Sequence, residues 1–226
     1  MNAIVEASAL VKGFGSGSRA VRAVDAVDLA IDAGDFAALA GPSGCGKTTL
    51  LNLIGGLERP DSGSVSVAGV RLERLDPRAL ARLRLERIGF IFQAANLIPV
   101  LTAIENAEYT LQVRGIGRAD RRSRLGALFE RLGIAGLESR FPGEMSGGEQ
   151  QRVAVARALA GEPAIVLADE PTANLDSGAA TALLDLLAAL NRERGVTLLV
   201  ASHDPLVIGR AGRTFRMRDG RIVPAA

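Results

Sequence analysis

The clearest chemical signal in the chain is a phosphate-binding loop. Residues 41–48 read Gly-Pro-Ser-Gly-Cys-Gly-Lys-Thr, which fits the spacing G-x-x-x-x-G-K-[ST]. In this pattern backbone N–H groups surround a phosphate, the lysine neutralises it and the hydroxyl holds Mg²⁺. An expected strand over 36–40 and an expected helix from Lys47 to Leu53 place the loop at a helix N-terminus, which attracts anions. This context disfavours the alternative of a glycine-rich turn with a chance lysine.

A second expected helix, from about Met145 to Ala160, carries two glycines in its first turn. Ser146 and Glu149 have the spacing of a capping box, which accounts for those two residues. It does not account for Gly147 and Gly148, because each glycine costs a helix up to roughly 1 kcal/mol relative to alanine. A partner that approaches this backbone closely would explain them. We therefore predict a second helix start that faces a phosphate.

Polar side chains follow three further expected strands. They are Gln93 after residues 88–92, Asp169 and Glu170 after residues 164–168, and His203 after residues 197–201. Open α/β sheets bind ligands beyond the carboxyl ends of their parallel strands. One carboxylate there suits Mg²⁺, and the next suits a base that orients an attacking water. A loop hydrogen bond is the alternative for Gln93, whereas the shared strand-end position favours a functional His203.

Composition narrows the class of protein. Of the 226 residues 48% are hydrophobic and 23% charged, as in a soluble globular protein, and the net charge of +2 does not indicate nucleic acid binding. One cysteine and one histidine exclude an intrachain disulfide and a cluster of such metal ligands. The N-terminus lacks a signal-peptide pattern, and the longest uncharged run, 88–104, is short for a membrane span. We expect a cytoplasmic protein unless a partner holds it at a membrane.

Three other segments have recognisable patterns. Residues 1–35 look β-rich, residues 94–139 look helical and residues 214–223 look like a hairpin that turns at Asp219-Gly220. Phe14 either stacks on a nucleobase or is a core or turn aromatic. The helical segment has a basic cluster that is either a solvated helix face or a contact to lipid or protein: Arg114, Arg118, Arg121, Arg122 and Arg124.

Taken together, the chain resembles the ATP-binding subunit of ABC transporters over essentially its full length. The family's motifs occur in order: 41–48, Gln93, 146–150, 169–170, the Asn174-Leu175-Asp176 loop and His203. The segment 89–106 resembles the branch that serves lipoprotein release and macrolide export. The resemblance implies an α/β P-loop NTPase fold with a mixed central sheet, an N-terminal antiparallel β subdomain and a helical insertion. It also implies one domain over 1–226, with a core of 1–93 and 161–226 and a helical subdomain of 94–160.

The resemblance also implies the site, its cofactors ATP and Mg²⁺, and its partners. Two copies would close head to tail over two ATP molecules and drive a separate membrane permease, which would hold them at the inner face of the membrane. One copy would supply Phe14, Gly41, Pro42, Ser43, Gly44, Cys45, Gly46, Lys47, Thr48, Thr49, Gln93, Asp169, Glu170 and His203. The other copy would supply Ser146, Gly147 and Gly148.

Each implied role belongs to a particular group. Thr48, Gln93 and Asp169 would hold Mg²⁺, Glu170 would polarise the water and His203 would contact the γ-phosphate. Asp176 would report across the interface. The family often has tyrosine at Phe14 and leucine at Met145, and neither departure removes the stacking or the apolar contact.

Alternatives remain open from the residues. An ABC ATPase that acts on ribosomes or DNA usually has two cassettes or a long coiled-coil insertion, which 226 residues do not accommodate. A P-loop kinase or GTPase would lack the second glycine-bearing helix start. Cys45 is interpreted as a small filler residue, with redox control as the alternative.

Overall fold

The β-rich N-terminal segment contributes two strands to a four-stranded antiparallel sheet in the computed structural model, which describes residues 3–17 and 20–224. The strand order is β2-β1-β4-β5, with β1 (Ala3–Phe14), β2 (Val21–Asp32), β4 (Ser62–Val67) and β5 (Val70–Arg71). Alternate residues within these strands, such as Val27, Leu29 and Ile31 of β2, are buried. The alternation seen in the sequence therefore turns one face of this sheet towards the core.

The second sheet is mixed and has the order β10-β9-β3-β8-β7-β6. Its strands are β3 (Phe36–Ala40), β6 (Ile88–Ile91), β7 (Ile165–Asp169), β8 (Leu198–Ser202), β9 (Arg213–Arg218) and β10 (Arg221–Val223). All neighbours are parallel except the β9–β10 hairpin. In the register, Ala40 is opposite Ser202 and Asp169 is opposite Ala201, so the carboxyl ends of these strands form one edge. Strand β6 ends at Ile91, one residue earlier than predicted, and Gln93 lies in the loop that follows.

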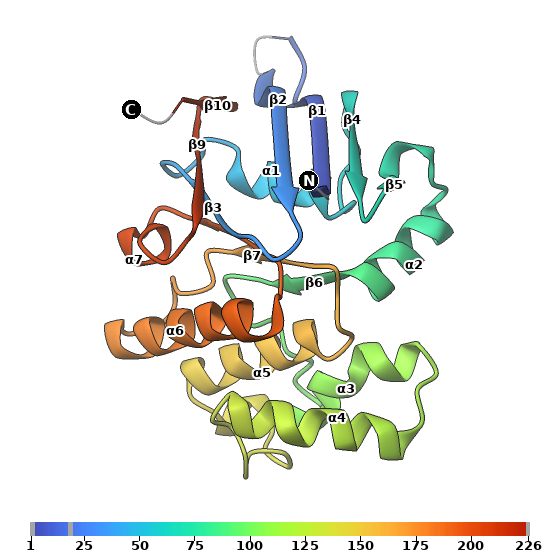
Figure 1. The fold of residues 1–226 in the computed structure, drawn as a ribbon, viewed down its shortest axis with the longest axis vertical. Helices are drawn as coiled ribbons and strands as arrows, with labels where there is room; N and C mark the ends of the chain where they lie inside the picture. The colour runs from blue at the N-terminus through green and yellow to red at the C-terminus, as the bar shows by residue number, and fades with distance from the viewer. Residues whose placement is uncertain (1–2, 18–19, 225–226) are drawn as a thin grey trace.

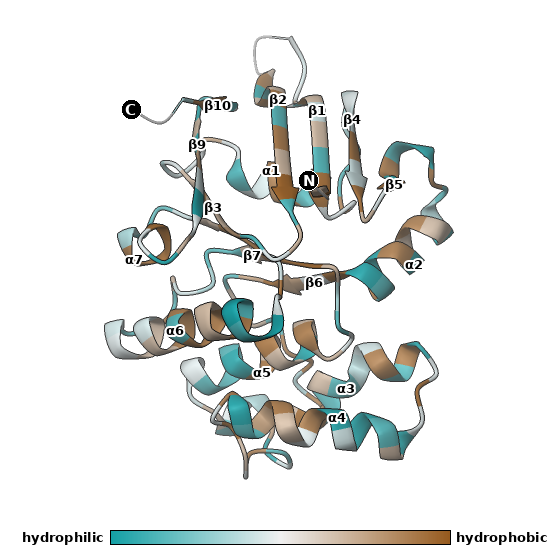
Figure 2. Ribbon diagram, in the orientation of Figure 1, coloured by the Kyte–Doolittle hydropathy of each residue, from teal (hydrophilic) through white to brown (hydrophobic). Residues whose placement is uncertain are grey.

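Helices cover the two faces of the mixed sheet (Figure 1). On one face α1 (Lys47–Ile54) shares a core with the antiparallel sheet. The other face carries α5 (Gly147–Leu159) and α6 (Ser177–Arg194), and α3 (Ala103–Val113) and α4 (Arg118–Arg131) pack against α5 on the side away from the sheet. Successive strand residues alternate between these cores, as Leu167 and Ala168 do, because side chains of a strand point to opposite faces. Figure 2 shows the result as brown strands β6 and β7 and banded helices α4 and α5.

Two further α-helices are α2 (Pro77–Arg87), which begins after the N-cap Asp76, and α7 (Pro205–Ile208), a single turn that the sequence patterns did not predict. Two 3₁₀ helices, Leu72–Arg74 and Pro142–Glu144, lie in the connections. None of the helices within residues 3–17 and 20–224 is both long and apolar enough to cross a membrane.

The basic cluster of the helical segment is largely engaged inside the chain. Buried Glu108 of α3 accepts a hydrogen bond from Arg121 Nε at 3.2 Å, and Arg122 Nε lies 3.4 Å from the same carboxylate. Arg114 donates to the carbonyl of Gly161 at 2.8 Å. The interpretation of the cluster as a solvated face is therefore wrong for these three arginines, whose charges tie α3 to its neighbours.

We predict that Arg121→Met lowers the free energy of unfolding by about 2–3 kcal/mol, because Glu108 loses a charged partner in a buried position. Urea unfolding followed by circular dichroism would measure it. The matched control is Arg118→Met on the same helix, where the arginine is exposed and a change within about 0.5 kcal/mol is expected. Equal losses in both variants would contradict the assignment.

Candidate active site

The phosphate loop connects the end of β3 to α1, and its glycines are required by what lies behind them. Gly46 is the N-cap of α1 with a φ of 104°, a conformation that favours glycine. A Cβ on Gly46 would lie 2.0 Å from the carbonyl oxygen of Ala23, and one on Gly41 would lie 2.2 Å from that of Met217. The loop backbone therefore packs directly on strands β2 and β9, and no side chain fits between them.

Lys47 is buried within this loop, with 6% of its side chain exposed. Its Nζ donates to the carbonyls of Gly41 and Pro42 at 2.8 and 3.1 Å and lies 3.6 Å from Glu170 Oε1. Carbonyl dipoles and a carboxylate thus compensate the buried ammonium. Cys45 is a residue of the same loop and is 5% exposed, which agrees with its interpretation as a filler residue.

Asp169 ends β7 and presents an unsatisfied oxygen. Its Oδ1 is buried and has no hydrogen-bond partner among the described residues. Burial raises the pKa of Asp169 above its ordinary value, while the hydroxyl of Thr48 opposes that shift. A carboxylate that is poorly compensated in this way favours a cation beside it.

Glu170 is held by the end of the neighbouring strand β8. Its Oε2 accepts a hydrogen bond from the Ser202 hydroxyl at 2.8 Å, and its Oε1 lies 3.0 Å from His203 Nδ1. Burial alone raises the pKa of Glu170, but these two hydrogen bonds and the charges of His203 and Lys47 set it below its ordinary value. The carboxylate is therefore ionised at neutral pH. Its φ of 44° is unusual for a residue with a side chain, a conformation that surrounding contacts must stabilise.

Gln93 is exposed in the loop after β6, where its carbonyl accepts a hydrogen bond from Asn174 Nδ2 at 3.1 Å. Asn174 follows Glu170 on the next connection, so the Gln93 loop is tied to the end of β7. Asp176 in the same connection is the N-cap of α6, and its side chain accepts from Ala179 N at 2.8 Å. The structure thus gives Asp176 a local role in the free chain.

Side chains of helix α5 also donate hydrogen bonds to the Gln93 loop, a contact that the sequence did not reveal. Gln151 Nε2 donates to the carbonyl of Phe92 at 2.9 Å. Arg157 donates to the carbonyls of Ala95 and Asn96 at 2.8 and 2.7 Å. Because three carbonyls of an irregular loop are bound by one helix, the loop and α5 are expected to move together.

The first turn of α5 has the predicted capping box and no internal reason for its glycines. Ser146 N donates to Glu149 Oε2 at 2.7 Å, and Glu149 N donates to Ser146 Oγ at 3.3 Å. A Cβ on Gly147 or Gly148 would meet nothing closer than 3.8 and 3.5 Å respectively. These are ordinary contact distances, in contrast to those at Gly41 and Gly46. Nothing in the described chain therefore demands glycine at these two positions.

Phe14 lies at the end of β1 and is 46% exposed, so it is not a core aromatic. The ammonium of Lys12 lies 5.4 Å from its ring centroid. Lys12 is in turn held by the carbonyl of Arg59 at 2.9 Å, and Asp61 accepts from Gly13 N at 2.7 Å. The end of β1 therefore presents the ring of Phe14 to solvent.

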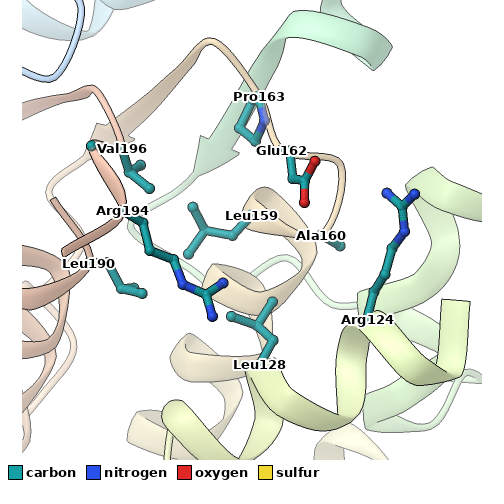
Figure 3. A pocket seen from close by; sticks show the side chains of 10 residues that line it. Arg124, Leu128, Leu159, Ala160, Glu162, Pro163, Leu190, Arg194 and Val196 are labelled. Carbon is teal, nitrogen blue, oxygen red and sulfur yellow. The ribbon is translucent and has the colours of Figure 1, made fainter. Parts of the chain in front are cut away.

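A cavity of about 340 Å³ lies away from these residues, between α4 and the C-terminal ends of α5 and α6 (Figure 3). Leucines such as Leu159 form its wall, and the guanidinium groups of Arg124 and Arg194 lie on opposite sides of it. None of the predicted ATP-site residues lines it. This cavity is therefore not the predicted ATP site.

Comparison with known proteins identifies the class. Residues 24–173 match the family model of the ABC transporter, so the chain belongs to this family. It is an ATP-binding cassette that hydrolyses ATP, and the prediction of fold and family is confirmed. The alternatives of a P-loop kinase or GTPase are excluded.

Individual relatives narrow the branch. The chain is 43% identical to the lipoprotein-releasing system ATP-binding protein LolD of Geobacter metallireducens, covering 99% of both chains. It is 44% identical over 97% of its length to the macrolide export ATP-binding/permease protein MacB of Hyphomonas neptunium, but it spans only 34% of that protein. A dimeric post-hydrolysis structure of the ATP-binding cassette MJ0796, bound to ADP and Pi, superposes with a TM-score of 0.90 at 38% identity over 97% of both chains.

We predict that Ser202→Ala lowers the ATPase rate at neutral pH roughly fivefold, the value of one hydrogen bond. Loss of the hydroxyl also raises the pKa of Glu170, so the acid limb of the pH–rate profile moves to higher pH. Steady-state ATPase assays across pH 5–9 would show this. Thr181→Ala, which removes a hydroxyl from α6, is the control and should leave the profile unchanged. An unshifted acid limb in Ser202→Ala would contradict the role of Ser202 in keeping Glu170 ionised.

Proposed function

We propose that the chain is the ATPase subunit of a membrane transporter and that two copies close head to tail over two ATP molecules. The observation that carries this proposal is the contrast between the two glycine-bearing helix starts. The glycines of the phosphate loop are explained inside the chain, whereas Gly147 and Gly148 are not. Their helix also packs in the core on the other face of the sheet from α1 (Figure 1). A second copy provides the close approach that these glycines allow, and the MJ0796 cassette is described as dimeric.

In this assembly each ATP site combines residues of both copies. One copy binds the nucleotide with Phe14 and residues 41–49, and the other covers the γ-phosphate with the helix N-terminus at residues 146–148. Exposure of Pro42, Ser43 and Gly44 in the single chain supports this division, because their side of the loop faces solvent. The γ-phosphate then lies between two helix N-termini, and its loss weakens the contact between the copies.

The donor set fits Mg²⁺. Thr48 supplies a hydroxyl, Gln93 an amide oxygen and Asp169 the carboxylate oxygen that lacks a partner. No group of three or more His, Cys, Asp or Glu side chains within residues 3–17 and 20–224 could hold a metal alone. Mg²⁺ at such sites is commonly bound by one or two protein groups, waters and substrate phosphates. When bound, it would neutralise phosphate charge during transfer.

The remaining groups fit hydrolysis by water. Glu170, kept ionised by Ser202 and His203, orients the water that attacks the γ-phosphorus, and the bond to the β-phosphate oxygen breaks to leave ADP. Lys47 stabilises the charge that develops on the transferred phosphoryl group. His203 contacts the same group from the end of β8.

A groove beside the Gln93 loop is the proposed docking surface for the permease. It has a volume of about 390 Å³ and is lined by Leu57, Leu85, Phe92 and Arg157 among others. Leu57 is 46% exposed on its rim, so its side chain is available for an apolar contact with a partner. Arg157 reaches both this groove and the carbonyls of the Gln93 loop, so a seated partner would sense the movement of α5.

The proposal extends to the place where the chain acts, the kind of transport it serves and the unit that moves. The chain would lie at the cytoplasmic face of the membrane, held there by its permease, and the relatives LolD and MacB support a role in lipoprotein release or macrolide export. Residues 94–160 would move as the helical unit against the core of 1–93 and 161–226.

We predict that Glu170→Gln binds ATP, accumulates as a dimer and hydrolyses ATP about 10²–10⁴ times more slowly, because the group that orients water is lost. Size-exclusion chromatography with ATP and a phosphate-release assay would measure both effects. Wild-type turnover by this variant would contradict the assignment of Glu170 as the residue that orients the attacking water.

Ser146→Arg tests the shared site. The bulky side chain should block the partner's ATP and abolish hydrolysis, while binding of ATP to the single copy stays within about twofold of wild type, since the phosphate loop is untouched. Equilibrium binding of a fluorescent ATP analogue would show this. A large loss of binding in the single copy would place Ser146 in the chain's own site instead.

Leu57→Glu tests the groove. A charge there should greatly reduce co-purification with the permease and stimulation of the ATPase by it, and leave the isolated ATPase unchanged. Val70→Glu, an exposed aliphatic position on β5 outside the groove, is the matched control. If both variants bind the permease normally, the groove is not its docking surface.

A further inference from the structure

The turn between β9 and β10 is bonded directly to the phosphate loop. Gly220 N donates to the carbonyl of Cys45 at 3.0 Å. Asp219 and Gly220 both have positive φ, 47° and 78°, as the tight primed hairpin turns require. The Asp-Gly pair therefore does more than reverse the chain, because its shape aims one N–H group at the loop.

This bond fixes the direction of a neighbouring amide. The carbonyl of Cys45 and the N–H of Gly46 belong to one peptide unit, which is planar and trans, so the two groups point in opposite directions. When Gly220 holds the carbonyl on the inner side of the loop, the N–H of Gly46 must point to the other side. Phosphate loops bind phosphate through their backbone N–H groups. Gly220 thus orients one of the groups that would meet the nucleotide.

The turn is itself anchored to β2 by Asp25. The backbone N–H of Asp25 donates to the carbonyl of Gly220 at 2.8 Å. Its carboxylate accepts Arg221 Nε at 2.8 Å and Arg22 Nη1 at 2.9 Å, and the side chain is only 14% exposed. The two arginines are 65% and 68% exposed, so solvent weakens these ion pairs, and their effect on the turn comes from their geometry. Arg221 is adjacent to Gly220, so the ion pair keeps the turn seated.

The packing around the turn leaves little freedom. A Cβ on Gly220 would lie 3.0 Å from the carbonyl oxygen of Arg22 and 3.1 Å from that of Ala23. Met217, on the strand that leads into the turn, has its carbonyl oxygen against Gly41. A shift of the hairpin would therefore be transmitted to the loop at two places.

We propose that Asp25 and Arg221 are positioning residues for nucleotide binding, acting through Gly220 on the peptide unit of Cys45 and Gly46. This role needs the phosphate loop to bind nucleotide and is independent of the dimer and of the permease. A contact to phosphate exists in the ground state and in the transition state alike. Its loss therefore raises KM and leaves kcat unchanged.

The test compares Asp25→Asn, Arg221→Met and the double variant. The dissociation constant for a fluorescent ADP analogue is the first readout, because ADP binding does not require the second copy. We expect it to rise about two- to fivefold in each variant, the change that loss of an exposed ion pair can produce, and no further in the double variant. In ATPase assays KM should rise in parallel, with kcat within about twofold of wild type.

Two variants separate positioning from general damage to the fold. Arg221→Lys keeps the charge and should restore most of the affinity. Arg218→Met removes an exposed arginine from the same hairpin that does not contact Asp25, and it should bind ADP like wild type. Unchanged ADP affinity in Asp25→Asn and Arg221→Met would overturn the proposal, as would an equal loss in Arg218→Met.

Discussion

The structure depends on one constraint, which is that the buried ammonium of Lys47 and the backbone N–H groups of its loop must remain available to bind an anion. Lys47 is almost completely buried and relies on two carbonyls of its own loop and on Glu170. The loop that holds Lys47 needs glycine at positions 41 and 46, because backbone carbonyls of other segments lie against it there and leave no room for a side chain. Two elements distant in sequence, β2 and the β9–β10 hairpin, supply those backbone segments. The phosphate loop is a motif of eight consecutive residues, but the backbone that packs against it comes from other parts of the chain.

The parallel order of the strands explains the rest of the site. Strand β8 lies between β3 and β7, so Ser202 and His203 emerge beside both the phosphate loop and Glu170. The two carboxylates at the end of β7 then have different surroundings. Asp169 keeps an unpartnered oxygen that suits a cation, whereas Glu170 is surrounded by donors that keep it ionised. These two adjacent carboxylates differ in their surroundings because β7 ends at Asp169, whereas Glu170 has a positive φ and no longer follows the strand.

Much of this could be predicted from sequence, and the failures share a cause. The phosphate loop, the capping box at Ser146 and the strand-end residues are local patterns, so they were visible without a structure. Ser202, Gln151 and Arg157 were missed as functional contacts because a side chain that bonds a distant group leaves no periodic trace. The partner of Arg121 was missed for the same reason, since Glu108 lies 13 residues away on another helix. Sequence shows which groups a segment offers and leaves open which distant groups accept them.

The Gln93 loop is the segment through which we propose that hydrolysis is coupled to movement. It has no regular structure, yet Asn106 of α3 binds its distal part through Ile98 N at 2.7 Å and Leu101 O at 2.9 Å. Helix α5 and Asn174 bind the proximal part. A loop held along its length by side chains cannot absorb a displacement by bending, because each bond would be lost without replacement from buried surroundings. We therefore expect a change at Gln93 to shift α3 and α5 as well, and with them the first turn of α5, which is proposed to cover the partner's nucleotide.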